Sequence, residues 1–363
     1  MHTPAPAHPN PAPTETDAVV IGAGPVGLYH AFQLGLLDVH CHIVDALPHA
    51  GGQPVALYPG KPIFDIPGVP ICTGQELTDN LLKQVAPFRP TWHLGETVTA
   101  LIPQTDGRFL LETSAHTRLQ ARVVVIAAGV GAFQPRELKA PGIETLAPTH
   151  LTYHPTHIGP RAGQRVLVVG GDDAALEFAL ALSAPGPQQA AHVTLLHRRD
   201  VHSAEAATLA ALQARLRLPG LQNLTGQVTG VDGGEHGKPI GVHIDTPEGN
   251  ACRLELDHIA VFLGLSPRLG PVAQWGLNMA RKQLVVSHED FQTSVPGIFA
   301  VGDVNTYPGK KKLIVCGFHE AVLAAYGVQA HLHPDSPALL QYTTTSPKLH
   351  RLLGLPEPGQ PKA

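Results

Sequence analysis

D-A-V-V-I-G-A-G-P-V-G-L-Y, residues 17–29, is the most informative stretch of this sequence. The apolar run Val19–Ile21 is typical of a buried strand, and it leads directly into three glycines spaced as G-x-G-x-x-G. Gly22 permits a tight turn, Gly24 lets a pyrophosphate approach the backbone, and Gly27 lets the following helix pack close to the strand. The stretch predicts a strand, a glycine turn and a helix whose N-terminus favours phosphate groups.

An acidic residue follows the next predicted strand. We expect the helix over residues 28–36 and a second strand over residues 40–44, which ends in Asp45. Asp45 lies 21 residues after Gly24 (45 − 24), close to the ~20 residues expected for a carboxylate that binds a ribose hydroxyl. A structural turn followed by a surface acid is the alternative. The joint occurrence of strand, glycines, helix, strand and acid favours a dinucleotide-binding unit.

Composition limits the class of protein. The chain has 363 residues, enough for about two domains, and 43% of them are hydrophobic. The net charge of −4 argues against general nucleic-acid binding, which usually needs a basic surface. The start of the chain is rich in Pro and Ala without an apolar core, so we expect a disordered tail rather than a secretory signal. No apolar run reaches the ~18 residues of a membrane span, and we expect a cytoplasmic protein.

Neither the cysteines nor the histidines form a recognisable reactive motif. The four cysteines lie far apart without a C-x-x-C pair, so we expect them to pack in the interior: Cys41, Cys72, Cys252 and Cys316. The 22 histidines include no H-E-x-x-H or H-x-E pattern, so no metal site is expected.

Residues 47–68 are rich in Gly and Pro, which predicts a long extended loop with a functional role. Within it, Gln53 can donate and accept hydrogen bonds, and Tyr58 offers a flat aromatic face. Both suit a flavin ring, although a tyrosine of the core is the alternative. Further on, Thr73 and Glu76 have the spacing of a capping box, which predicts the start of a helix.

A second strand, turn and helix begin near residue 165. The strand that follows them ends in H-R-R-D, so Arg198 and Arg199 stand where Asp45 stands in the first unit. Two guanidiniums suit a 2′-phosphate, which favours NADP over NAD; a solvated strand edge is the alternative. Gly170 opens this turn, but Asp172 takes the place of the middle glycine. A carboxylate there is expected to repel a pyrophosphate.

The last informative element is residues 293–304, where an apolar strand ends in Gly302 and Asp303. The Asp303 carboxylate can accept hydrogen bonds from ribityl hydroxyls, and a role as helix N-cap is the alternative. A helix is expected over residues 317–330.

With two nucleotide-binding units and A-V-G-D at 300–303, the chain resembles the two-domain flavoproteins of the thioredoxin reductase type. More narrowly, it resembles the thioredoxin-reductase-like ferredoxin-NADP reductases. The similarity covers roughly residues 16–346 and includes G-G-Q-P-V-A-L-Y-P, G-A-F-Q-P-R and A-V-G-D-V-N-T-Y-P-G-K. Thioredoxin reductases have a C-x-x-C where residues 149–157 of this chain contain no cysteine, so we expect electrons to leave the flavin directly.

The resemblance implies an α/β fold of two Rossmann-like dinucleotide-binding domains, with the NADP domain inserted in the FAD domain. The FAD-binding domain is expected over 16–138 and 289–349, and the NADPH-binding domain over 139–288. Residues 1–15 and 350–363 are expected to be flexible tails.

The resemblance also implies site residues for each cofactor. FAD would be held by Gly22, Gly24, Asp45, Gln53, Tyr58, Val98, Phe133, Asp303 and Thr344, with Tyr342 in place of a family histidine that stacks on the flavin. NADP would be held by Gly170, Arg198 and Arg199, whereas Ser203 stands where the family has a further arginine.

These features predict a reductase that uses FAD and NADPH and passes single electrons to ferredoxin or flavodoxin, without a catalytic acid or base. The resemblance also suggests a homodimer. Lys310, Lys311 and Lys312 suit a docking rim for an acidic ferredoxin, and a solvated lysine run is the alternative. Two alternatives stay open: a flavoprotein that reduces a small molecule or a thioredoxin-like protein, and a flavin redox sensor without turnover.

Overall fold

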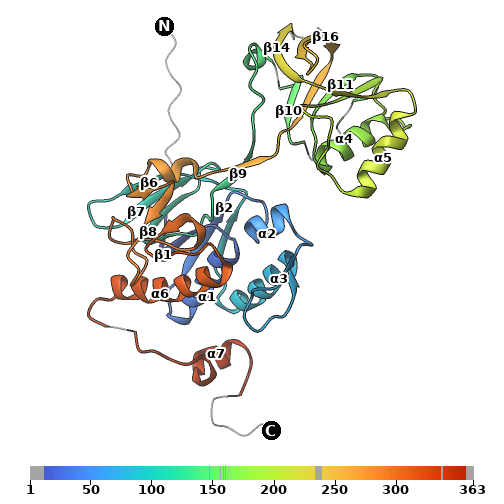
Figure 1. Ribbon diagram of the computed structural model, residues 1–363. Coiled ribbons are helices and arrows are strands. Elements are labelled where there is room, and N and C mark those ends of the chain that lie inside the picture. Colours follow the sequence, from blue (N-terminus) through green and yellow to red (C-terminus); the bar gives the residue numbers. More distant parts are fainter. Residues whose placement is uncertain are drawn as a thin grey trace, which may run out of the picture. The chain divides into compact units, whose positions relative to one another are not determined.

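The computed structural model describes residues 12–146, 148–155, 157, 159, 161–233, 239–336 and 338–356. They form an α/β fold of two compact units: unit 1 is Met1–Ala132 with Arg268–Ala363, and unit 2 is Phe133–Pro267 (Figure 1). We expected the domain boundaries after residues 138 and 288; the structure places them after 132 and 267. The chain is part of unit 1 well before residue 288, because Val272 and Leu277 pack in the core of that unit and β20 (Gln283–Val285) pairs with β22 (Asn305–Thr306).

Unit 1 is built on a seven-stranded sheet of order β5-β2-β1-β8-β7-β6, with β21 paired to β8. The strands β5, β2, β1, β8 and β21 are parallel to one another. The strands β7 and β6 continue the sheet with antiparallel pairing. Ala18–Val20 of β1 are fully buried, as expected of a parallel strand covered on both faces. The bounds are β1 (Thr14–Ile21), β2 (Cys41–Asp45), β5 (Thr91–Leu94), β6 (Val98–Pro103), β7 (Phe109–Thr113), β8 (Arg118–Ile126) and β21 (Ile298–Ala300).

Three long helices belong to unit 1: α1 (Pro25–Leu36), α3 (Gly74–Val85) and α6 (Ile314–Leu332). α1 packs against both of the others, and Figure 1 shows the three together below the sheet. The predicted capping box of α3 is confirmed. Thr73 Oγ1 accepts from the Glu76 N–H at 3.1 Å, and Glu76 Oε2 accepts from the Thr73 N–H at 2.8 Å.

The stretch after Asp45 is not the extended loop that we expected. Residues 52–57 form the short helix α2 (Gly52–Leu57), and β3 (Pro62–Ile63) then pairs with β4 (Cys72–Thr73). Pro54 lies in the first turn of α2, where no backbone N–H is needed. Glycine and proline at the start of a short helix have the same local signature as a loop, so the sequence pattern does not separate the two.

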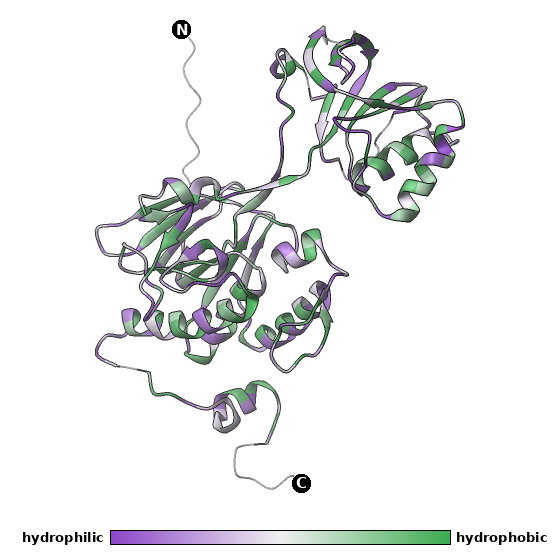
Figure 2. Ribbon diagram, in the orientation of Figure 1, coloured by the Kyte–Doolittle hydropathy of each residue, from purple (hydrophilic) through white to green (hydrophobic). Residues whose placement is uncertain are grey.

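Unit 2 has a five-stranded parallel sheet of order β10-β17-β11-β12-β13. Alternate residues of β11 face opposite sides, as the period of a strand requires. Val166 and Val168 pack with the helices α4 and α5, whereas Leu167 and Val169 pack with the antiparallel strands β14, β15 and β16. Both helices are coloured largely as hydrophobic in Figure 2, consistent with this packing.

The bounds in unit 2 are β10 (Leu151–Tyr153), β11 (Arg165–Gly170), α4 (Asp173–Ser183), β12 (His192–His197), α5 (Ala206–Leu216), β13 (Leu221–Thr225), β14 (Gln227–Gly233), β15 (Ile240–Asp245), β16 (Ala251–Leu256) and β17 (His258–Phe262). The remaining elements are β9 (Ala132–Pro135), β18 (Leu265–Arg268), β19 (Met279–Ala280), α7 (Pro347–Leu352) and the short 3-10 helices η1 (Ala86–Phe88), η2 (Ile143–Thr145), η3 (Gly270–Gln274), η4 (Gly302–Val304) and η5 (Thr343–Thr345). None of the helices formed by the described residues combines the length and apolarity needed to cross a membrane.

Candidate functional site

The glycine turn of unit 1 lies between β1 and α1. Gly22 has a φ of +116°, and a Cβ there would lie 2.3 Å from the carbonyl oxygen of Ala127, so only glycine fits. Gly24 is the N-cap of α1 and places no side chain over the N-terminal amides of the helix. A Cβ on Gly24 would have only Gly52 Cα, at 3.9 Å, within contact distance. The space beside this helix end is therefore open to an anion.

Asp45 lies directly at this turn. Its Oδ2 accepts from the Ala23 N–H at 2.6 Å and its Oδ1 from the Leu47 N–H at 2.8 Å. Burial raises the pKa of Asp45, and the two backbone donors partly oppose this effect. The end of β2 thus places a carboxylate at the glycine turn, hydrogen-bonded to the residue between Gly22 and Gly24.

Asp303 reaches the same turn from the other end of the chain. It follows Gly302 in η4, and a Cβ on Gly302 would lie 3.5 Å from Val26 in the first turn of α1. Burial raises the pKa of Asp303, while the nearby charges of Lys310 and Lys312 lower it. Asp45 and the Gly302–Asp303 segment, which are distant in sequence, therefore both lie beside the first turn of α1. The alternative of an N-cap for Asp303 is not supported, because η4 has no side-chain cap.

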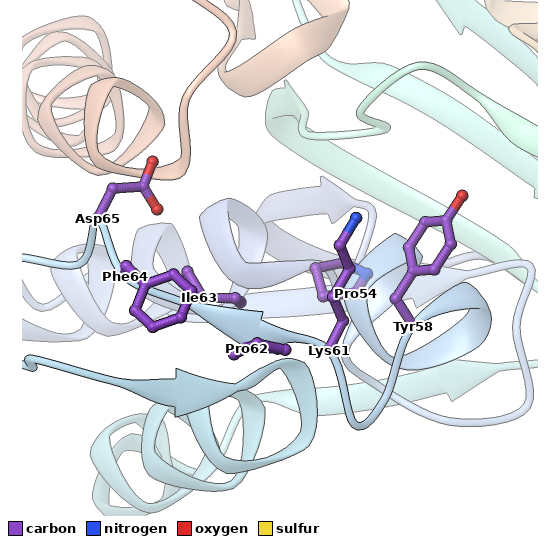
Figure 3. A pocket seen from close by; sticks show the side chains of 7 residues that line it. All are labelled: Pro54, Tyr58, Lys61, Pro62, Ile63, Phe64 and Asp65. Atoms are coloured by element: carbon purple, nitrogen blue, oxygen red, sulfur yellow. The ribbon is translucent and has the colours of Figure 1, made fainter.

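Tyr58 and Gln53 both lie on exposed positions of α2 and its C-terminal end. Tyr58 is 49% exposed, which excludes the alternative of a core tyrosine. It lines a pocket of about 360 Å³ with Pro54, Lys61, Pro62, Ile63, Phe64 and Asp65. Figure 3 shows Tyr58 at one end of the lining side chains, and Phe64 and Asp65 toward the other. One face of the pocket thus offers an aromatic ring to a planar ligand.

Unit 2 repeats the strand, turn and helix. At the end of β11, a Cβ on Gly170 would lie 2.6 Å from the Phe262 carbonyl oxygen, so the close approach requires glycine. β12 runs parallel beside β11, and Arg198 and Arg199 follow its carboxyl end as exposed side chains. The structure thus brings Gly170 and both arginines to one edge of the sheet, where nucleotides bind in such folds.

Both units together match a single family model. Residues 16–324 match the model of the pyridine nucleotide-disulphide oxidoreductases. The chain belongs to this family. No group of three or more His, Cys, Asp or Glu in the described part of this oxidoreductase could hold a metal ion.

Curated relatives cover nearly the whole oxidoreductase. A protein named ferredoxin-NADP reductase from Polaromonas naphthalenivorans (strain CJ2) is 51% identical over 346 residues, 95% of this chain and 94% of the relative. Another of that name, from Acidovorax sp. (strain JS42), is 53% identical over 353 residues, 96% of this chain and 98% of the relative.

Solved structures show the same two-domain fold at lower identity. Lactococcus lactis thioredoxin reductase aligns with a TM-score of 0.54 at 22% identity, covering 88% of this chain and 99% of that chain. A bacillithiol disulfide reductase from Staphylococcus aureus aligns with a TM-score of 0.58 at 18% identity, covering 89% and 100%. The likeness establishes the thioredoxin-reductase-like fold of this oxidoreductase.

Glu320 of α6 is a residue of the unit 1 site that our sequence analysis missed. Its carboxylate is fully buried and accepts from the Gly302 N–H at 2.7 Å, Asn305 Nδ2 at 2.9 Å and the Tyr307 hydroxyl at 2.9 Å. A signal was available: Gly317, Glu320, Ala321 and Ala324 all lie on the buried face of α6, so the acid falls in an otherwise small and apolar stripe.

Lys310 is the cation that pairs with this acid. Its Nζ lies 2.5 Å from Glu320 Oε1, and it also donates to the Gly302 carbonyl oxygen at 2.8 Å. Our expectation that Lys310 belongs to an exposed docking rim is wrong, because its side chain is only 6% exposed. Lys311 and Lys312 are exposed.

Asp172 of unit 2 is the N-cap of α4, and its Oδ1 accepts from the Ala175 N–H at 3.1 Å. The neighbouring Asp173 accepts from the Glu205 N–H at 2.9 Å. The turn therefore presents a carboxylate at the N-terminus of α4, the end of the helix where a pyrophosphate binds in such folds.

The other expected flavin residues are less clearly placed. Val98 is buried within β6, and the side chain of Phe133 lies outside the described residues. Tyr342, which is 71% exposed, and Thr344 lie in the C-terminal segment. Among the contacts of the described residues, none joins either side chain to Gly24.

The C-terminal segment is anchored elsewhere on α1. Lys348 of α7 donates to the Gly35 carbonyl oxygen at 2.6 Å and pairs with Asp38. Gly35 lies near the C-terminal end of α1, about 16 Å along the axis from Gly24 at ~1.5 Å per residue.

Proposed function

We propose that this oxidoreductase is a FAD-dependent ferredoxin-NADP reductase. The observation that carries the proposal is the pair of glycine turns in one chain. Asp45 and the Gly302–Asp303 segment lie beside one turn, and Arg198 and Arg199 follow the strand next to the other. The name and the roughly full-length similarity of the curated relatives support the same activity.

The residues of unit 1 fit FAD. The open N-terminus of α1 at Gly24 suits a pyrophosphate, Asp45 suits a ribose hydroxyl, and Asp303 suits the ribityl chain. The exposed ring of Tyr58 suits one face of the flavin, with Gln53, Val98, Phe133, Tyr342 and Thr344 as further lining residues. Bound FAD would accept a hydride from NADPH and release single electrons.

The chain's own residues bind, orient and shield the reactants, and none acts as an acid or base. Gly170 and the two arginines of unit 2 hold NADPH, whose 2′-phosphate matches the paired guanidiniums. Residues 149–157 contain no cysteine, and all four cysteines of the chain are free, which supports direct exit of electrons from the flavin.

The acceptor in this proposal is a ferredoxin or a flavodoxin in the cytoplasm. Lys312, whose charge acts on Asp303, and its neighbour Lys311 remain exposed and provide positive charge for an acidic partner. The chain acts as a homodimer, which the exposed Leu339 and Leu340 of the C-terminal segment support, because such side chains gain stability from burial.

The test is a spectrum of the purified protein, followed by anaerobic titration with NADPH and assays with three acceptors. We expect a flavin spectrum, rapid bleaching by NADPH, and faster reduction of ferredoxin or flavodoxin than of thioredoxin. A preference for thioredoxin would replace the proposed acceptor. A bound flavin that NADPH does not bleach would instead indicate a redox sensor, and a colourless protein indifferent to FAD would end the proposal.

A further inference from the structure

The two nucleotide turns of this chain differ at the N-cap of the helix. Gly24 caps α1 with φ −71° and ψ 177°, and Asp172 caps α4 with φ −99° and ψ 174°. Each N-cap carbonyl accepts the first helical bond, from the Leu28 N–H at 2.9 Å and from the Leu176 N–H at 3.1 Å. The backbones are alike at the N-cap, so the side chain there distinguishes the two helix ends.

In unit 2 the Asp172 side chain accepts a hydrogen bond from one of the free N–H groups at the N-terminus of α4. The Ala175 N–H, which a bound phosphate could take, already donates to Asp172 Oδ1. In unit 1 no side chain caps α1, so its amides stay available. A carboxylate at the N-cap also repels a second anion brought to the same helix end.

Neighbouring residues hold the backbone of the unit 2 turn in place. A Cβ on Gly171 would lie 2.7 Å from the His197 ring, and the Gly171 carbonyl oxygen accepts from the Ser203 N–H at 2.7 Å. Asp173 binds the Glu205 N–H, so the segment around 203–205 braces the turn. Asp172 thus lies in a fixed backbone rather than in a free loop.

From this contrast we propose that Asp172 lowers the affinity of the nicotinamide nucleotide site for any dinucleotide; this inference rests on the proposed function. Its carboxylate acts as a built-in anion that competes with the dinucleotide pyrophosphate for the end of α4. Binding then depends on the 2′-phosphate held by Arg198 and Arg199. The consequence is weaker binding of NADP and NAD alike, so that only the dinucleotide with a 2′-phosphate retains useful affinity.

Three ligands separate the contributions, each measured by calorimetry on the FAD-loaded protein. NADP⁺ has both groups, 2′-AMP has a 2′-phosphate without a pyrophosphate, and NAD⁺ has a pyrophosphate without a 2′-phosphate. Asp172→Asn keeps an N-cap acceptor and removes the charge, whereas Asp172→Gly reproduces the N-cap of α1. Glu177→Gln removes an exposed charge from the same helix and is the matched control.

We expect Asp172→Gly to tighten NADP⁺ and NAD⁺ binding by about tenfold, Asp172→Asn to do so by a smaller factor, and 2′-AMP binding to change less than about twofold. Glu177→Gln changes none of the three. Thermal unfolding and FAD content check that each variant is folded; should Asp172→Gly fail to fold, Asp172→Asn carries the test.

The outcomes also separate this inference from the proposed function. If the wild type binds NADP⁺ and the Asp172 variants bind it equally well or more weakly, the inference is overturned. The NADP site of the proposed function then still stands. NADP⁺ binding by Asp172→Gly alone supports the inference. Absence of binding in the wild type and both variants overturns the inference together with the NADP part of the proposed function.

Discussion

The ammonium of Lys310 lies 2.5 Å from the carboxylate of Glu320, and the two side chains are 6% and 0% exposed. Both groups also bind the backbone of Gly302, Lys310 at its carbonyl oxygen and Glu320 at its N–H. This buried ion pair therefore clamps the turn that carries Asp303. A paired and fully hydrogen-bonded charge is the only kind that a protein interior tolerates well.

Removing one partner of this pair leaves an uncompensated buried charge. We expect Lys310→Met to lower the free energy of unfolding by about 3–5 kcal/mol and to weaken FAD binding. The double variant Lys310→Met with Glu320→Leu should recover part of this loss, because no charge stays buried. Denaturant unfolding and FAD titration measure both effects. Lys311→Met, at an exposed position, is the control, and an equal loss there would contradict our account.

Substitutions of two glycines in the first turn are expected to separate an effect on stability from an effect on FAD binding. Gly22→Ala places a Cβ 2.3 Å from the Ala127 carbonyl oxygen at a φ of +116°, so we expect loss of stability as well as of FAD. Gly24→Ala meets only Gly52 Cα at 3.9 Å, and we expect stability to change by less than about 1 kcal/mol while FAD binding weakens. Thermal unfolding with and without FAD checks both variants. Equal effects of the two substitutions would disprove this division.

The exposed ring of Tyr58 is available to the flavin in the proposed function. Because Tyr58 is 49% exposed, Tyr58→Ala should change stability by less than about 0.5 kcal/mol in the FAD-free protein. In the FAD-loaded protein we expect brighter flavin fluorescence, since a stacked ring quenches the flavin. Tyr58→Phe keeps the ring and should remain quenched. Similar fluorescence of both variants would place Tyr58 away from the flavin.

Buried histidines predict a loss of stability on mild acidification. Burial lowers the pKa of His30, His42 and His258 to about 4, from 6.5. The unfolded chain then binds more protons than the folded chain between pH 6.5 and 4, so stability is fully present above pH 6.5 and is lost as the pH falls through this window. The raised pKa values of Asp45 and Asp303 act in the opposite direction.

Denaturant unfolding between pH 7.5 and pH 4.5 measures this dependence. His42 lies 3.0 Å from His93, Nδ1 to Nε2, within unit 1. We expect His42→Leu to have a shallower decline of stability with falling pH than the wild type. An unchanged slope would show that His42 does not titrate between the two states.

Charge reversal tests the proposed partner. Lys311→Glu with Lys312→Glu should lower kcat/KM for ferredoxin about tenfold at low salt, with a weaker salt dependence, because electrostatic attraction speeds association. Flavin reduction by NADPH should not change. Lys83→Glu, an exposed lysine in α3, is the control. An unaltered rate and salt dependence would remove these lysines from the docking surface.

Some features of the site were predictable because their signals are local. The glycine turn, Asp45 and the paired arginines each lie within or directly after a regular strand, so the direction of the chain determines where they lie. The capping box of α3 is readable for the same reason. The helix α2 was not predictable, since Gly51, Gly52 and Pro54 are compatible with both a loop and a short helix.

The linear pattern alone established two strand-turn-helix units, an acid in the first and arginines in the second, because each depends on residues that are neighbours in the chain. The tertiary structure alone decided that Lys310 is buried with Glu320, that the chain returns to unit 1 at Arg268, and that Asp172 caps α4. These results depend on desolvation, strand pairing and side-chain orientation. Such quantities are defined only once distant segments have packed together.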